Sequence, residues 1–205
     1  MFQNIKWLFF DVGSTLVDEQ LAYEQRFHEI AECAGVSFNR VKEQALSFYR
    51  KNKKGDLKVA EHFGVKLLKW PVEYEKPYVD AAQCLACLHQ KYSIGIIANQ
   101  LTGTSIRLEK YGLLPFIDLV IASAEEGVAK PDSRIFELAL SRSGCLPEHA
   151  VMIGDWIDND IMPVKRMGMH TIWIKQGFGQ YWNILTAAEE PDFSVSCLRE
   201  LCSIL

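Results

Sequence analysis

Short apolar runs recur along the chain, and most of them are nearly continuous in hydrophobicity. Continuous apolar runs of this length are typical of strands that are covered on both faces of a sheet. Five runs predict strands: Ile5 to Phe10, Ser93 to Ala98, Asp118 to Ala122, Ala150 to Ile153 and His170 to Ile174.

Helical stretches of crossover length lie between the last four of these strands, and a glycine follows each stretch. Glycine is common just after a helix because it adopts the left-handed conformation that ends many helices. Strands that alternate with such helices predict an α/β fold with a doubly wound parallel sheet. The helices are expected at Thr102 to Tyr111, Asp132 to Ser143 and Asp158 to Met167.

The connection between Phe10 and Ser93 is far longer than the others. Within it, residues 19–33 and 41–49 place apolar side chains at roughly helical spacing, so we expect a helical insertion over the sheet. The expected domains are a sheet domain of residues 1–16 and 81–205 and a small helical domain of residues 17–80.

Composition restricts the classes of partner. The 205 residues are 49% apolar, which suffices for a full core without disulfides or a structural metal. The net charge of −4 gives no overall positive field, so neither nucleic acid nor an anionic membrane is an expected partner. No apolar run has the length of a membrane span, and the first residues carry no signal-peptide pattern, so we expect a cytoplasmic protein. The six cysteines, including Cys84 and Cys87 inside an expected helix, are then reduced thiols.

Polar side chains follow four of the expected strands. Asp11 comes after the first strand, Asn99 after the second, Lys130 after the third, and Asp155 and Asp160 after the fourth. The carboxyl ends of parallel strands share one edge of the sheet, where doubly wound sheets bind their ligands. Taken singly, each residue can be explained as a turn cap, a helix N-cap or an exposed loop residue. Together, carboxylates from two strands and a nearby lysine predict a site for Mg²⁺ and a phosphoryl group.

The chain resembles the haloacid dehalogenase superfamily over essentially its whole length. FFDVGSTLVDE matches the first motif of that family, IGIIANQ the second, GVAKPDSRIF the third and VMIGDWIDNDI the fourth. The resemblance implies a Rossmann-like core and an α-helical cap, residues 17–80, that lies between the first two motifs and closes over the site.

The resemblance also implies a role for each polar residue at the strand ends. Asp11 would attack phosphorus and form an aspartyl-phosphate, and Lys130 would pair with Asp11 and the phosphate. Mg²⁺ would bind Asp11, the backbone carbonyl of Gly13 and Asp155, while Asp160 would hold metal-bound water or Lys130.

The chain departs from the family pattern at two positions. Phosphatases of the family carry a second aspartate two residues after the nucleophile, where this chain has Gly13. The second motif normally ends in a phosphate-binding Thr or Ser, and here it ends in Ala98, so backbone N–H groups such as that of Asn99 would cradle the phosphate. We therefore expect weak proton transfer, poor turnover of alkyl phosphates, and a gain of about 10²-fold in the Gly13→Asp variant.

Two functions remain open from the sequence. The first is a Mg²⁺-dependent phosphohydrolase that acts on a small phosphorylated metabolite through Asp11, as a monomer or weak homodimer. The alternative is a catalytically impaired relative that binds a phosphorylated ligand or a protein partner with the retained metal site. Turnover of phosphate esters, acyl phosphates and aryl phosphates distinguishes the two.

Overall fold

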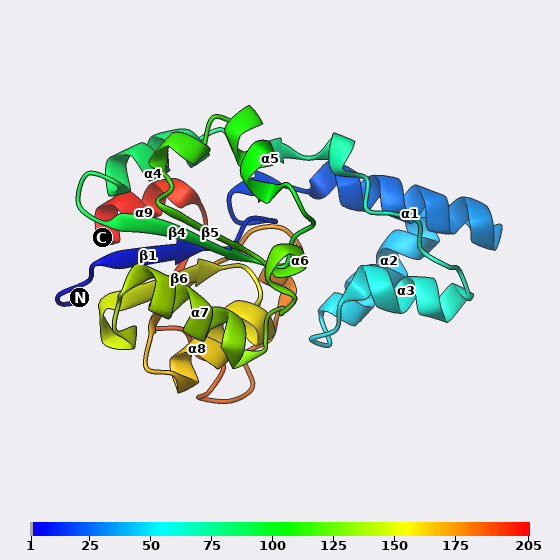
Figure 1. Cartoon of the computed structure of the whole chain (residues 1–205). Coiled ribbons are helices and arrows are strands. Elements are labelled where there is room, and N and C mark those ends of the chain that lie inside the picture. The colour runs from blue at the N-terminus through cyan, green and yellow to red at the C-terminus, as the bar shows by residue number, and fades with distance from the viewer. Residues whose placement is uncertain (1) are drawn as a thin grey trace.

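Six parallel strands lie at the centre of the molecule, in the order β5-β4-β1-β6-β7-β8. A computed structural model describes residues 2–205 (Figure 1). The five predicted strands are confirmed with small differences at their ends, whereas the sequence did not predict β8, which has only three residues, two of them exposed. The strands are β1 (Trp7–Phe10), β4 (Ser93–Ala98), β5 (Leu119–Ala122), β6 (Ala150–Gly154), β7 (His170–Ile174) and β8 (Phe193–Val195).

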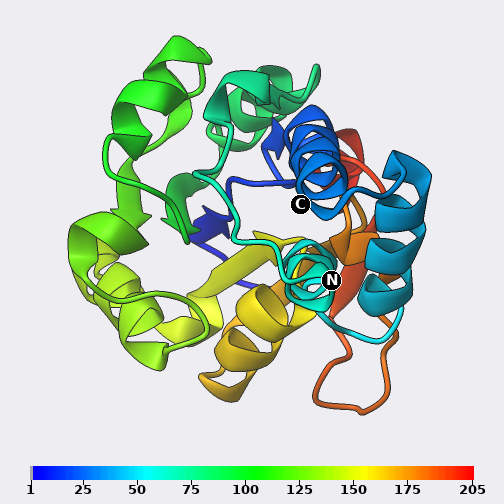
Figure 2. The ribbon, with the colours of Figure 1, turned by 90° about the vertical axis from the view of Figure 1, so that its right-hand side faces the viewer.

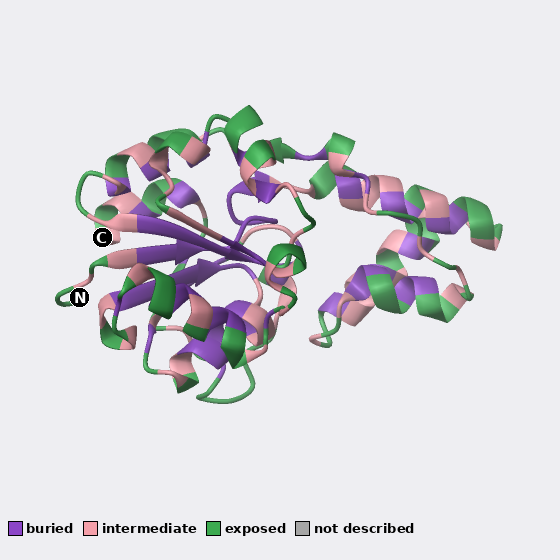
Figure 3. Cartoon of the chain, viewed as in Figure 1, coloured by how far each residue is buried: buried purple, intermediate pink, exposed green. Residues whose placement is uncertain are grey.

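Helices cover both faces of the sheet, which confirms the predicted α/β fold. Successive side chains of β1 point to opposite faces, so Leu8 and Phe10 pack beneath one helical layer and Phe9 beneath the other. The four central strands β1, β4, β6 and β7 are buried almost without interruption (Figure 3). The first layer contains α4 (Ala81–Leu88), α5 (Thr104–Lys110) and α9 (Leu198–Ile204), the second contains α7 (Ser133–Ser143) and α8 (Met162–Arg166), and α6 (Ser123–Glu126) follows β5.

The order of the strands reverses at β1. This strand pairs with β4 on one side and with β6 on the other, so that Phe10 lies between Ile96 and Ile153. Residues that follow β1, β4 and β6 therefore meet at one edge of the sheet, at the position where doubly wound sheets bind ligands.

Residues 17–80 form a helical segment beyond this edge. Its three helices, α1 (Gln20–Ala34), α2 (Phe38–Tyr49) and α3 (Gly55–Phe63), bury a separate apolar cluster. Figure 2, which views the molecule from the side of this segment, shows the three helices in front of the sheet. The two connections to the sheet pair with each other as the short antiparallel strands β2 (Val17–Asp18) and β3 (Lys76–Pro77), which the sequence did not predict.

The helical segment also contacts the sheet domain away from its two connections. Phe178, in the loop after β7, belongs to the apolar cluster of the segment and stacks on Tyr49 with ring centroids 4.5 Å apart. The side chain of Asn52 exchanges two hydrogen bonds with the backbone of Asn183, each 2.8 Å long. These contacts hold the segment over the carboxyl ends of the strands.

The helix predicted over residues 158–167 is divided in the structure. Residues Ile157–Ile161 form a π-helical turn, and α8 begins only at Met162. Pro163 has no backbone N–H to donate to the preceding turn, which explains why a regular helix does not run through it. Among residues 2–205, no helix has the length and apolar character needed to cross a bilayer.

Candidate active site

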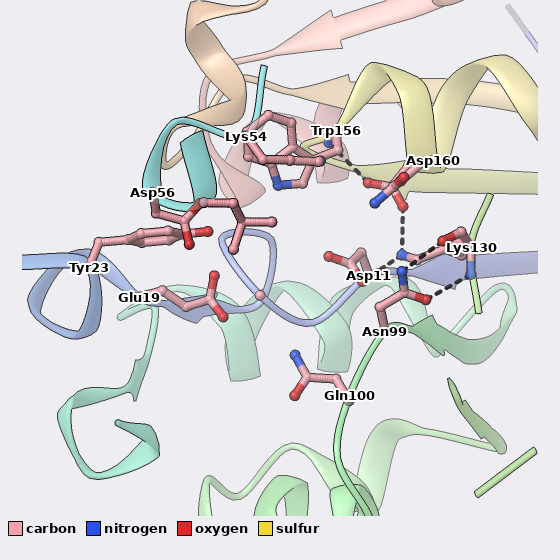
Figure 4. A pocket seen from close by; sticks show the side chains of 13 residues that line it. Asp11, Glu19, Tyr23, Lys54, Asp56, Asn99, Gln100, Lys130, Trp156 and Asp160 are labelled. Atoms are coloured by element: carbon pink, nitrogen blue, oxygen red, sulfur yellow. Dashed lines mark hydrogen bonds and ion pairs between the residues drawn. The ribbon is translucent and has the colours of Figure 1, made fainter. Parts of the chain in front are cut away.

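A buried lysine joins two carboxylates at the edge of the sheet. Asp11 directly follows β1, and Asp160 lies in the π-helical turn after β6. Lys130 Nζ donates to Asp11 Oδ1 and to Asp160 Oδ1, both at 2.6 Å, and its side chain is 2% exposed (Figure 4). Hydrogen bonds between charged groups at this distance are strong, so the three side chains fix one another in position.

Asn99 holds the backbone of Lys130. Its Oδ1 accepts a hydrogen bond from Lys130 N at 2.7 Å, and its Nδ2 donates to Lys130 O at 2.9 Å. The side chain of Asn99 thus joins the end of β4 to the loop that carries the lysine. Ala98 is fully buried in the core and does not line the cavity described below.

Asp155 is a buried carboxylate with unsatisfied oxygens. It is fully buried, and neither of its oxygens has a hydrogen-bond partner among residues 2–205. Oxygens from Asp11, Asp155 and Asp160 all lie within 4.8 Å of one another. A buried carboxylate without a partner destabilises the folded protein. A hard cation such as Mg²⁺ prefers oxygen ligands and would supply the missing partner, so these residues fit Mg²⁺.

Burial and charge shift the pKa values of these groups. Burial raises the pKa of Asp11 to about 6, although the Lys130 ammonium acts in the opposite direction. Burial, and after it the neighbouring charges of Asp11 and Asp160, raise the pKa of Asp155 well above its usual value. Burial lowers the pKa of Lys130, but the carboxylates of Asp11 and Asp160 outweigh it and raise that pKa above its usual range. Lys130 therefore carries its positive charge at neutral pH.

Glycines allow the loops of the site to pack closely. A Cβ atom on Gly154 would lie 2.4 Å from Asp160 Cγ, and a Cβ atom on Gly179 would lie 2.2 Å from the backbone oxygen of Asp155. The same Asp155 oxygen accepts a hydrogen bond from Trp173 Nε1 at 2.9 Å. A larger residue at position 154 would displace the Asp160 carboxylate, and one at position 179 would displace the backbone of Asp155.

Position 13 is next to a carboxylate that the sequence analysis did not identify. A Cβ atom on Gly13 would lie 2.5 Å from Glu19 Oε1 and 2.7 Å from Glu19 Oε2. Ser14 Oγ donates to Glu19 Oε2 at 3.1 Å. Burial, followed by the nearby charges of Glu75 and Asp11, raises the pKa of Glu19 to about 8. Glu19 is the last residue of the segment that matches the first motif, but only the folded turn places it beside Gly13.

A cavity of about 330 Å³ lies between the helical segment and the edge of the sheet. Figure 4 shows its floor, formed by Asp11, Lys130 and Asp160, and the side chains that enter from the helical segment. Those side chains are Glu19, Tyr23, Lys54, Asp56 and Leu57.

Lys54 is a second residue whose position the sequence did not reveal. Its Nζ lies 3.3 Å from Asp158 Oδ1 and 3.3 Å from the centre of the Trp156 ring. The ion pair and the ring contact fix a cation from the helical segment at the rim of the cavity.

Comparison with known proteins places this geometry in a family. The haloacid dehalogenase-like hydrolase family model matches residues 5–168. The chain is 29% identical to a glyceraldehyde 3-phosphate phosphatase of Pyrococcus furiosus over 99% of this chain and 94% of that protein. It is 34% identical to a protein of the same name from Methanopyrus kandleri over 64% of this chain, but it spans only 58% of that protein. A solved HAD phosphatase from Thermococcus onnurineus has a TM-score of 0.67 at 25% identity, covering 98% of this chain and 97% of that chain.

Proposed function

The chain belongs to the haloacid dehalogenase-like hydrolases, and we propose that it is a phosphatase that acts on small phosphorylated molecules through Asp11. The observation that carries the proposal is the buried contact of Asp11 with Lys130, beside the unpartnered Asp155 and at the floor of a cavity. A nucleophile, a fixed cation and a candidate metal ligand are the groups that phosphoryl transfer requires.

Asp11 is the proposed nucleophile. Lys130 holds Asp11 Oδ1, which leaves Oδ2 to attack phosphorus and form an aspartyl-phosphate. The Lys130 ammonium offsets negative charge on Asp11 and on the incoming phosphoryl oxygens, and Asp160 holds the lysine from the other side. Asn99 fixes the lysine backbone, so the cation is preorganised before the substrate arrives.

We propose that Asp11, Asp155 and the backbone carbonyl of Gly13 hold Mg²⁺, with Asp160 close by. Bound Mg²⁺ would supply positive charge that stabilises the phosphoryl oxygens as they transfer. Bound Mg²⁺ would also give a partner to the Asp155 carboxylate, whose two oxygens have no hydrogen-bond partner in the described chain.

Residues 17–80 are the proposed cap of this site. They place Tyr23, Lys54 and Asp56 against the cavity, opposite Asp11. A cap that closes over a bound substrate excludes water from the reacting groups. The cavity of about 330 Å³ favours a small substrate, and the triose phosphate in the names of the two archaeal relatives is a suitable first candidate.

The direct test is phosphate release by the purified protein with MgCl₂, from alkyl, aryl and acyl phosphates. We expect turnover of at least one class, and loss of it in the Asp11→Asn variant. Asp118→Asn is the matched control, because Asp118 lies at the opposite edge of the sheet, where its carboxylate contacts Ile94 N and His89 Nε2. Binding of a phosphate analogue without turnover of any class would instead support the non-catalytic alternative.

A further inference from the structure

Glu19 places a carboxylate where position 13 has no side chain. Gly13 is two residues after the proposed nucleophile, and a Cβ atom there would lie 2.5 Å from Glu19 Oε1 and 2.8 Å from Glu19 Cδ. A carboxyl group attached to position 13 would begin one bond beyond that Cβ atom. The Glu19 carboxylate therefore fills the space that an aspartate side chain at position 13 would need.

We propose that Glu19 is the general acid and base of this site, in place of the carboxyl group that position 13 lacks. The inference rests on the proposed phosphatase function and goes beyond it by assigning the proton transfer to a residue six positions after Gly13 in the chain.

The surroundings of Glu19 hold its carboxylate toward the cavity (Figure 4). Its one side-chain hydrogen bond within residues 2–205 comes from Ser14 Oγ to Oε2, which leaves Oε1 free. Gly177 packs closely against Ser14, because a Cβ atom on Gly177 would lie 2.4 Å from Ser14 Oγ. Gly13 also forms a backbone bridge with Val17, which brings the turn back toward Asp11.

Two other carboxylates of the helical segment, Asp56 and Glu75, each lie within 4.0 Å of an arginine. Asp56 accepts a hydrogen bond from Arg26 at 2.7 Å and another from Tyr49 at 3.2 Å. Glu75 Oε1 accepts one from Trp70 Nε1 at 2.6 Å, and its Oε2 lies 3.8 Å from Arg107 Nε, beyond hydrogen-bond distance. Within the part of the chain that the structure describes, no cation lies within 4.0 Å of Glu19. Among these three carboxyl groups, Glu19 is the one without an arginine partner in the described residues, and it is therefore the best suited to exchange a proton with a bound substrate.

The reaction balances with Glu19 in this role. Asp11 forms a bond to phosphorus as the bond from phosphorus to the leaving oxygen breaks, and protonated Glu19 gives its proton to that oxygen, so an alcohol leaves. The Glu19 carboxylate then takes a proton from a water molecule that attacks phosphorus. The bond between phosphorus and Asp11 breaks, which releases phosphate and restores both residues.

The Glu19→Gln variant separates this role from a structural one. For an alkyl phosphate we expect turnover to fall by about 10²- to 10⁴-fold. With p-nitrophenyl phosphate the leaving group needs no proton, so we expect a nitrophenol burst at nearly the wild-type rate, followed by slow steady-state release. A purely structural loss would slow the burst as well. The control is Glu32→Gln, an exposed glutamate on α1, with no expected change in either phase.

Moving the carboxyl group from position 19 to position 13 is a second test of the proposed role of Glu19. Glu19→Ala should lose alkyl phosphate turnover, and the double variant Gly13→Asp with Glu19→Ala should recover it to within about tenfold of wild type. Gly13→Asp alone should bring no gain, because the new side chain meets the Glu19 carboxylate. This replaces the expectation from the sequence that Gly13→Asp alone improves turnover.

Three results would overturn the inference. They are full alkyl phosphate turnover in Glu19→Gln, a gain of about 10²-fold from Gly13→Asp with Glu19 present, and failure of the folded double variant to recover. Unfolding midpoints of all variants establish that they are folded. If Asp11→Asn is inactive while Glu19→Gln is unaffected, only the role of Glu19 fails. If the wild-type protein has no turnover, the proposed function fails with it.

Discussion

At the scale of single residues, the site concentrates negative charge in a buried space. Asp11, Asp155 and Asp160 share one neighbourhood, and Lys130 is the cation that bonds to two of them. Asp155 has no such partner within residues 2–205. Binding of a divalent cation is therefore linked to the stability of the fold as well as to catalysis.

The metal-free protein is expected to lose stability as the pH rises. Burial raises the pKa of Asp11 to about 6 in the folded state, from an ordinary value of 3.8, so the folded protein binds this proton more tightly than the unfolded chain. The resulting stabilisation is complete below about pH 4 and is lost as the pH passes about 6. Urea unfolding in EDTA should show a loss of up to about 3 kcal/mol across this range relative to Asp11→Asn, which lacks the titrating group. Equal pH profiles for the two proteins would contradict the account.

The Asp155→Asn variant should separate two effects of the buried Asp155 carboxylate: the loss of stability in the metal-free protein and the binding of Mg²⁺. We expect the unfolding midpoint of the metal-free variant at pH 7 to rise, because the substitution removes an unpartnered buried carboxylate. We also expect added MgCl₂ to stabilise the wild-type protein and to have little effect on the variant. Equal stabilisation of both proteins by MgCl₂ would remove Asp155 from the proposed metal site.

Much of the site could be predicted from the sequence, because its residues directly follow strands. The sequence indicates Asp11, Asn99, Lys130, Asp155 and Asp160, and the structure brings these five residues to one edge of the sheet. The sequence does not indicate Glu19 and Lys54, whose positions depend on how a turn and a cap loop fold back over that edge. No spacing pattern in the sequence encodes such contacts.

At the scale of elements, the predicted strands were the reliable part, since each is a continuous apolar run that must be buried. The strands that the sequence missed are two or three residues long, as in β2, β3 and β8, and carry too few apolar positions to be recognised. The π-helical turn of Ile157–Ile161 was also missed, because its polar residues fit a regular helix start equally well.

The close approach of β6 to the π-helical turn gives a prediction for Gly154→Ala. The added Cβ atom would lie 2.4 Å from Asp160 Cγ, so the carboxylate must move away from Lys130. We expect weaker binding of Mg²⁺ and phosphate analogue, together with a loss of about 1–3 kcal/mol in stability. Gly35→Ala is the control: its φ is 64° and its surroundings are open, so it should cost stability without changing ligand affinity. Unchanged affinity in Gly154→Ala would contradict the proposed positioning of Asp160.

At the scale of the whole molecule, the cap joins the sheet domain through the β2–β3 pair and touches it again at Phe178 and Lys54. The β2–β3 pair is short, and short connections can absorb the backbone changes of a closing motion. Because Glu19 lies between β2 and α1, the same connection positions the proposed proton donor.

Closure of the cap over the sheet domain should be measurable when Mg²⁺ and a phosphate analogue occupy the site. With MgCl₂ and fluoroberyllate, we expect reduced hydrogen exchange in residues 17–18 and 76–77 and a smaller radius of gyration in solution scattering. The Phe178→Ala variant, which removes the stacking contact with Tyr49, should show a larger radius of gyration before ligand is added. Identical exchange and scattering with and without saturating ligand would contradict a closing cap.

The central claim is that Asp11 carries the phosphoryl group during turnover, and mass spectrometry of the acid-quenched protein tests it most directly. After mixing with MgCl₂ and p-nitrophenyl phosphate, the account predicts one covalent phosphoryl group per chain, located on Asp11. It also predicts that this species accumulates in Glu19→Gln and is absent from Asp11→Asn. Turnover by the wild-type protein with no phosphoryl adduct in Glu19→Gln, or an adduct on a residue other than Asp11, would contradict the account.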